Sequence, residues 1–108
     1  MAAEGQYFGG NVALLGKLGV GTLNPTEKID VDGNVSLTDN SKIKLGTSDD
    51  FQLYHDGSQS RITDIGTGRL TIETNGDSIR LTKGTSENMA IFTPDGSVDL
   101  YYNNVKKV

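Results

Sequence analysis

The sequence predicts an all-β chain of short strands, and three observations support this fold class. Apolar residues are nowhere sustained at the i, i+3, i+4 and i+7 positions that mark an amphipathic helix. From Val35 onward, apolar and polar residues alternate in runs of four to six residues, which is the period of a half-buried strand. Glycines recur between these runs at steps of 8 to 13 residues, so a turn is expected between most neighbouring strands.

The first third of the chain, residues 1–33, differs from the rest in composition. Seven of the fourteen glycines lie between Gly5 and Gly33, together with the apolar stretch from Val12 to Leu15. We expect a loosely structured, glycine-rich leading or anchoring segment here. One strand is predicted inside it, from Lys28 to Val31, before the turn at Asp32-Gly33.

Residues 34–108 are predicted to form a repetitive β shaft. Asp-Gly and Asn-Gly dipeptides accept positive φ in tight turns, so each of them can reverse or bend the chain. They occur at Asp32-Gly33, Asp56-Gly57, Asn75-Gly76 and Asp95-Gly96. The predicted strands of the shaft are Val35 to Thr38, Lys42 to Leu45, Phe51 to His55, Arg61 to Asp64, Arg69 to Glu73, Ser78 to Thr82, Met89 to Thr93 and Ser97 to Tyr102.

The apolar faces of these strands are narrow. Leu, Ile, Val and Phe make up 27 of 108 residues, above the roughly 20% level at which disorder is expected, but they occur singly or in pairs. A sandwich of this size needs broader inner faces and more large aromatic residues. Three narrow faces meeting on an axis fit better, so we predict an elongated homotrimeric fibre of the triple β-helix or β-prism type. The predicted trimer-core residues are Ile43, Leu45, Phe51, Leu53, Leu70, Ile72, Ile79, Leu81, Ile91, Val98 and Leu100.

Charge and composition disfavour several classes of protein. The net charge is −4 and acidic and basic residues are interspersed, so no basic stripe is present for nucleic acid. No apolar run approaches the roughly 20 residues of a membrane-spanning helix, and Met1 to Gly10 lacks the features of a signal peptide. The chain has no cysteine, which removes disulfides and thiolate metal sites. We therefore expect no nucleic-acid partner, no membrane insertion and no cofactor.

Three segments resemble the repeats of bacteriophage tail fibres, including those common among marine phages. They are GVGTLNPTEKIDVDGNVSL (Gly19 to Leu37), FQLYHDGSQSRITDIGTGRLTIET (Phe51 to Thr74) and SVDLYYNNVKKV (Ser97 to Val108), and together they cover about half the chain. The resemblance implies a trimer of intertwined β-structure on the outside of a virion, with a role in host recognition or its mechanical support. In that family the third segment usually leads into further repeats, so a fragment or a short fibre is expected here.

Two alternatives to an adhesive tail-fibre segment remain. One is a fibre that decorates or stabilises a capsid and binds another virion protein through Met1 to Gly21. The other, weaker alternative is a carbohydrate-cleaving adhesin of the tailspike kind, in which paired carboxylates would act on sugars. Neither Asp49-Asp50 nor Asp64 with Glu73 stands out as such a pair, so we expect no enzyme. The expected external partner is a host surface glycan or protein, and Tyr101-Tyr102 is the densest aromatic spot, with one ring expected to face solvent.

His55 is the only histidine, and by strand parity it shares a face with Phe51 and Leu53. In a trimer, three copies of His55 could meet near the axis and bind a metal or anion. The simpler expectation is a histidine whose ring is satisfied by a backbone carbonyl or by water.

Two further motifs fall short of their templates. Gly10 to Leu18 has five residues between its glycines where a phosphate-binding loop needs four, and it lacks the final Ser or Thr. An apolar patch on a glycine-rich linker is the alternative. Asp30 to Asn34 resembles part of a calcium loop but lacks the closing Glu, so turn chemistry explains it better.

Overall fold

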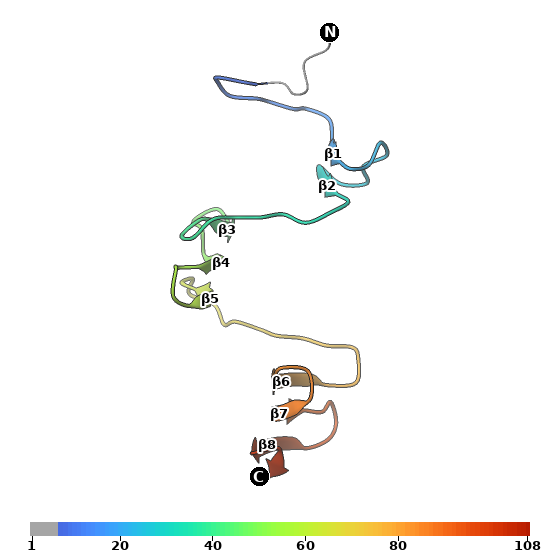
Figure 1. Cartoon of the computed structure of the whole chain (residues 1–108), viewed down its shortest axis with the longest axis vertical. Helices are drawn as coiled ribbons and strands as arrows, with labels where there is room; N and C mark the ends of the chain where they lie inside the picture. The colour runs from blue at the N-terminus through green and yellow to red at the C-terminus, as the bar shows by residue number, and fades with distance from the viewer. Residues whose placement is uncertain (1–6) are drawn as a thin grey trace. The chain divides into compact units, whose positions relative to one another are not determined.

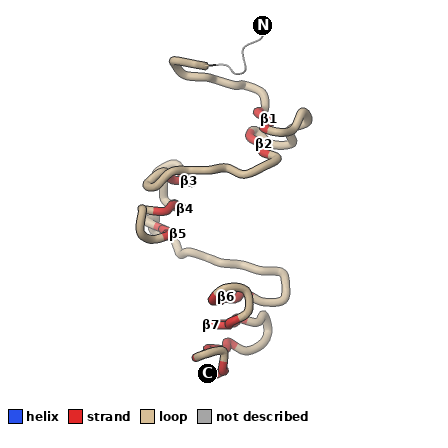
Figure 2. The backbone as a smooth tube through the Cα atoms, viewed as in Figure 1, coloured by secondary structure: helices blue, strands red, loops and turns tan. Residues whose placement is uncertain are grey.

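The computed structural model describes residues 7–108, and within that range the chain forms nine β-strands and no helix (Figures 1 and 2). The predicted all-β class is therefore confirmed. The chain divides into two compact units, Met1–Thr63 and Asp64–Val108. This division falls thirty residues beyond the compositional boundary at Gly33.

The first unit begins with a two-stranded parallel sheet of β1 (Leu18–Val20) and β2 (Ile29–Val31). Backbone hydrogen bonds extend the pairing at both ends: Leu18 N donates to Lys28 O at 2.8 Å, and Asp32 N donates to Val20 O at 2.8 Å. Parallel strands so short need a crossover between them, and residues 21–28 supply it as a loop. The glycine-rich third thus contains one more strand than predicted.

A three-stranded sheet in the order β3-β4-β5 completes the first unit, with β3 (Lys42–Leu45), β4 (Phe51–His55) and β5 (Ser60–Asp64). β3 and β4 are antiparallel, with Ile43 opposite Leu53 and Leu45 opposite Phe51. The β4–β5 turn uses Asp56-Gly57, where Gly57 has φ +92° as the dipeptide predicts.

The second unit contains a four-stranded antiparallel meander in the order β6-β7-β8-β9. Its strands are β6 (Ile79–Lys83), β7 (Glu87–Phe92), β8 (Val98–Tyr102) and β9 (Val105–Lys106). A bulge interrupts the β6–β7 ladder between Leu81 and Thr82. Asn103 and Asn104 join β8 to β9, both with positive φ (49° and 57°), as a two-residue hairpin turn requires.

Two predicted strands are not strands in the structure. Residues 35–38 and 69–73 run outside any sheet, although their sequences alternate as well as those of the strands that form. Alternation of side chains makes a segment suitable for a sheet. The segment becomes a strand only where a neighbouring strand forms backbone hydrogen bonds with it. The Asn75-Gly76 dipeptide also differs from expectation, because neither residue adopts positive φ.

The core within one chain is very small. Among the described residues only Ala90 and Ile91 are buried apolar residues, and both lie on β7, the strand with two long neighbours. Most large apolar side chains of both units remain exposed.

Candidate assembly surface

The four-stranded sheet carries one face whose two central rows are apolar. Register places Leu81, Ala90 and Leu100 in one row across β6, β7 and β8, and places Ile79, Phe92 and Val98 in a second row. Residues directly opposite each other, or two apart along a strand, share a face of a sheet. Beyond these rows, the Lys83–Glu87 ion pair continues the face along β6 and β7, and Tyr102 continues it along β8. We call the six side chains of the two central rows the apolar face of the second unit: Ile79, Leu81, Ala90, Phe92, Val98 and Leu100.

The opposite face of the same sheet is charged around a single apolar residue. Arg80, Ile91 and Asp99 form one row across it. Lys106 Nζ lies 2.8 Å from Asp99 Oδ1, and the Asp99 side chain is only 14% exposed. The Lys106 ammonium beside it lowers the pKa of the Asp99 carboxyl, because the positive charge favours the ionised form.

Register therefore assigns Ile91 to the charged face, whereas Phe92 and Ala90 belong to the apolar face. Of these three residues, only Ile91 is among the predicted trimer-core residues. Met89 to Phe92 are four consecutive apolar residues, so alternation gives no signal for which of them face the same way. Only the bulge and the cross-strand register decide the parity of β7.

A hollow of about 380 Å³ opens beside this apolar face. It is lined by Ile72, Ile79 and Phe92. Ile72 belongs to the unpaired segment that precedes β6, so the hollow joins that segment to the sheet face within the second unit. Because three apolar side chains line the hollow, it is a place where another apolar group would be stabilised.

The first unit has a narrower version of the same arrangement. Cross-strand register places Ile43, Leu45, Phe51 and Leu53 on one face of the β3–β4 pair. Ile43 and Leu45 are exposed, while Phe51 and Leu53 are half-buried. On the opposite face the Lys42 ammonium lies 4.4 Å from the centre of the Tyr54 ring, a cation–π contact. The two faces thus separate apolar from charged side chains.

His55 ends β4 and is exposed. Its Nδ1 lies 3.1 Å from Ser60 Oγ at the start of β5, so within the chain one ring nitrogen is satisfied by a hydroxyl. Across residues 7–108 no group of three or more His, Cys, Asp or Glu is placed to hold a metal ion. A metal site on a threefold axis would use one His55 from each of three chains and stays a prediction.

Asp56 organises the turn of the YHDGS motif. Its Oδ1 accepts hydrogen bonds from the backbone N–H of Ser58 (2.9 Å) and Gln59 (2.7 Å), and its Oδ2 accepts one from Arg61 Nε at 2.7 Å. The Arg61 hydrogen bond, followed by the two backbone donors, lowers the pKa of Asp56 to about 2. The motif is therefore explained by turn formation, with its carboxylate fully engaged.

Three of the other carboxylates in the motifs and pairs of the sequence, Asp30, Asp49 and Asp64, are also engaged locally. Asp30 Oδ2 accepts from the Thr26 N–H at 2.9 Å and from the Thr26 hydroxyl at 3.2 Å. Asp49 lies 3.5 Å from Lys44 Nζ. Asp64 Oδ1 accepts from the Gly66 N–H at 3.0 Å. Turns and surface ion pairs account for these positions.

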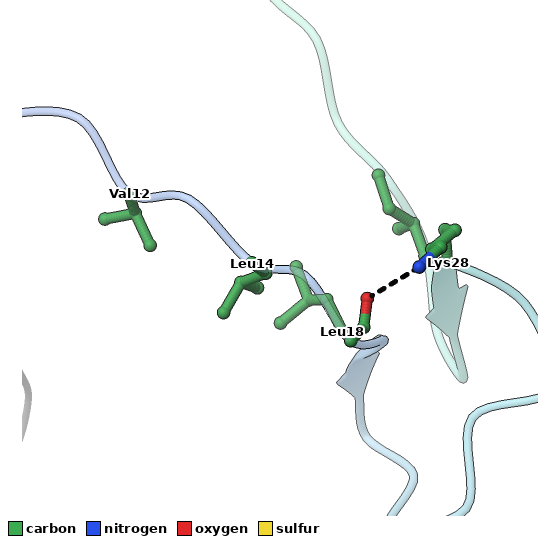
Figure 3. Close-up of a pocket in the computed structure, with 6 residues that line it drawn as sticks. Val12, Leu14, Leu18 and Lys28 are labelled. Carbon is green, nitrogen blue, oxygen red and sulfur yellow. Dashed lines mark hydrogen bonds between the residues drawn. The ribbon is translucent and has the colours of Figure 1, made fainter.

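An apolar cleft of about 280 Å³ lies in the glycine-rich part of the first unit (Figure 3). Lys28 crosses it: its Nζ donates to Leu15 O at 2.8 Å and lies 3.5 Å from Gly16 O, which holds the preceding loop against β2. Gly10 to Leu18 thus contributes apolar side chains to a cleft, as the apolar-patch interpretation expects. The lining residues are Val12, Leu14, Gly16, Leu18, Lys28 and Ile29.

The two adjacent tyrosines near the end of the chain face opposite ways, as predicted. Tyr101 is half-buried and shares the parity of Asp99, whereas Tyr102 is 68% exposed and shares the parity of Leu100. Tyr102 therefore adds an exposed ring to the apolar side of β8.

Fold and surface together define an all-β chain whose two larger sheets each present an exposed group of apolar side chains on one face. Comparison of the chain with family models, with curated proteins and with solved structures finds no match. Within the described residues no helix is long and apolar enough to cross a membrane.

Proposed function

We propose that this chain is a structural and adhesive segment of a homotrimeric β fibre of the phage tail-fibre kind, on the exterior of a virion, which supports attachment to a host surface. The observation that carries the proposal is the burial pattern. Two apolar residues are buried in the described chain, while more than twenty large apolar side chains are exposed. In a soluble protein, apolar surface on this scale marks an interaction site. Another molecule covers that surface in the assembled state.

The exposed area supports the same conclusion. The chain exposes 9609 Å². A compact monomer of 11.5 kDa exposes about 5,800 Å². The excess is about 3,800 Å², and an ordinary interface between the two units would remove at most about 1,500 Å² of it. The remainder of about 2,300 Å² per chain falls in the range of obligate oligomers.

Three copies fit the width of the faces. Each strand of the apolar faces contributes two side chains, so a face is narrow across the strand direction and continuous from strand to strand. Three such faces close around an axis and leave the charged faces, with Lys42, Arg80 and Asp99, toward solvent. The tail-fibre resemblance supports this arrangement, since its YHDGS motif forms the Asp56 turn and its LYYN motif forms the hairpin turn after Tyr102.

The test is the oligomeric state of the full chain at micromolar concentration. Static light scattering after size exclusion should give about 34 kDa, three times the chain mass of 11.5 kDa. An unboiled sample should also run as an oligomer in SDS, because intertwined trimers unfold slowly. A folded monomer with a cooperative thermal transition would overturn the proposal.

A second candidate role, in a capsid-decorating fibre, is favoured by the cleft in residues 12–29. There the apolar side chains would seat a partner protein of the particle. Leu14→Asp places a charge in the cleft and spares both strands of the parallel sheet. Particles that lose the fibre with this variant, while the purified variant still forms trimers, would favour the anchoring role.

A further inference from the structure

The segment Leu70 to Thr74 has the sequence of a strand but no strand partner within residues 7–108 of its own chain. Among the described residues, no backbone hydrogen bond is formed by the N–H or C=O groups of Leu70 to Glu73. In Figure 2 this stretch runs as loop between β5 and β6. Buried backbone N–H and C=O groups are almost always hydrogen-bonded. If another chain buries this segment, the N–H and C=O groups of the segment therefore need hydrogen-bond partners.

Its side chains are arranged for a half-covered strand. Leu70 and Ile72 are two residues apart and are 46% and 66% exposed, while Thr71 and Glu73 alternate with them. A solvated connector has no need for an apolar pair at strand spacing. Ile72 also lines the hollow with Ile79 and Phe92, so the apolar side of the segment meets the apolar face of the second unit.

A strand edge able to pair with the segment is present in every copy. β6 lies at the end of its sheet, so one edge of Ile79 to Lys83 has no strand beside it in the described part of the chain. Long open edges of this kind are templates for pairing with another chain. In a symmetric assembly the unpaired segment of each copy can pair with the open β6 edge of the next copy. The hydrogen-bonding groups of both are then satisfied at every interface.

We infer that Leu70 to Thr74 forms a strand by pairing with a second copy of this chain. The open edge of β6 in that copy forms backbone hydrogen bonds with the segment. The inference rests on the proposed homotrimer and names the segment that crosses the chain boundary. A second copy is the occupant because the exposed excess left for other copies, about 2,300 Å² per chain, exceeds the roughly 800 Å² per partner of a standard interface.

Hydrogen exchange of the assembled protein, resolved to single amides, tests this directly. A strand paired along one edge hydrogen-bonds alternate amides, so either the amide of Ile72 or those of Thr71 and Glu73 should exchange at least about a hundredfold more slowly than in an unstructured peptide, in the range of the amides of β7. Assembled trimers in which these amides exchange at peptide rates would overturn the inference and leave the proposed function standing. A monomer in the scattering experiment would overturn the proposed function, and the inference with it.

Proline substitution tests the two edges of the segment separately. Thr71→Pro and Ile72→Pro each remove one N–H, and successive N–H groups point to opposite edges of a strand. Thr71→Ala and Ile72→Ala are the matched controls, since they remove the side chain and keep the N–H. Neither amide is hydrogen-bonded among the described residues of the single chain, so at least one proline variant should reduce the SDS-resistant oligomer about tenfold or more below its alanine control. Two proline variants that assemble like their controls would contradict the inference.

Discussion

Leu81 and Leu100 flank Ala90 from the two neighbouring strands, because Ala90 is in register with both. Their side chains leave Ala90 only 5% exposed while they themselves remain 51% and 44% exposed. Because Ala90 is smaller than Leu81 and Leu100 on either side, the face is lower at Ala90 and can accept an apolar group there. Ala90 at the centre of the apolar face is thus covered within its own chain, while Leu81 and Leu100 beside it remain exposed.

A charge on the apolar face of the second unit should prevent assembly. Leu81→Glu would bury a carboxylate without a partner when a second copy covers the face, at a cost of at least about 2 kcal/mol per chain. Arg80→Glu places the same residue on the charged face of the same strand, next in sequence, and is the control. In sedimentation experiments Leu81→Glu should be monomeric and Arg80→Glu trimeric. Equal behaviour of the two variants would contradict the assignment of the faces.

The Asp56 turn should give the protein an acid-sensitive contribution to stability. Arg61 and two backbone donors hold the pKa of Asp56 at about 2, below its ordinary 3.8. A carboxyl with a depressed folded pKa stabilises above its unfolded pKa and loses that contribution as the pH falls through the folded value. The contribution is therefore complete above about pH 4 and disappears between about pH 4 and pH 2.

Asp56→Asn isolates that contribution, because the amide oxygen can still accept from Ser58 and Gln59 but cannot form the ion pair. The melting temperature of the variant should lie below that of the wild type at pH 7, and the difference should shrink toward pH 2. Arg61→Gln should give a smaller change of the same sign. A difference that is constant from pH 7 to pH 2 would refute the assignment.

The Asp99–Lys106 pair should stabilise the last hairpin. Asp99 is mostly covered, and no aligned hydrogen bond reaches its Oδ1 in the described chain, so the Lys106 charge compensates the carboxylate. Lys106→Met leaves that charge uncompensated and should lower the melting temperature. Asp99→Asn combined with Lys106→Met should restore part of the loss, since no buried charge then remains. A double variant less stable than Lys106→Met would exclude this explanation.

Gly21 should be required for the parallel sheet. Its φ is +78°, and a Cβ there would lie 2.6 Å from the carbonyl oxygen of Asp32, whose N–H pairs with Val20. Gly21→Ala should destabilise the first unit by at least about 1–2 kcal/mol, from the left-handed conformation alone. Gly10→Ala is the control, because a Cβ there meets nothing within 4 Å. Circular dichroism melts of the two variants should therefore differ clearly.

Local patterns predicted those strands whose partners lie close in sequence. Lys42 to Leu45 and Phe51 to His55 are strands over the full predicted ranges, because alternation and a short turn bring them together. Leu18–Val20 escaped prediction, since three residues in a glycine-rich stretch carry no period and its parallel partner follows a loop. β9 is shorter still, and only the positive φ of Asn103 and Asn104 folds it back.

The candidate surface was predicted only in part. Leu81, Val98 and Leu100 follow from alternation and lie on one face. Phe92 and Ala90 could not be assigned, because they stand in a continuous apolar run where the period of two is invisible. The homotrimer and the axial position of His55 stay predictions.

By itself the sequence determined the all-β class, most strand positions and the thinness of the apolar faces, because these depend on residue type and spacing along the chain. The tertiary structure alone decided which way β7 faces and which predicted strands lack a partner. The physical reason is that both depend on hydrogen bonds between distant segments: register sets the parity of every side chain across a sheet, and an extended segment becomes a strand only when a neighbour completes its ladder.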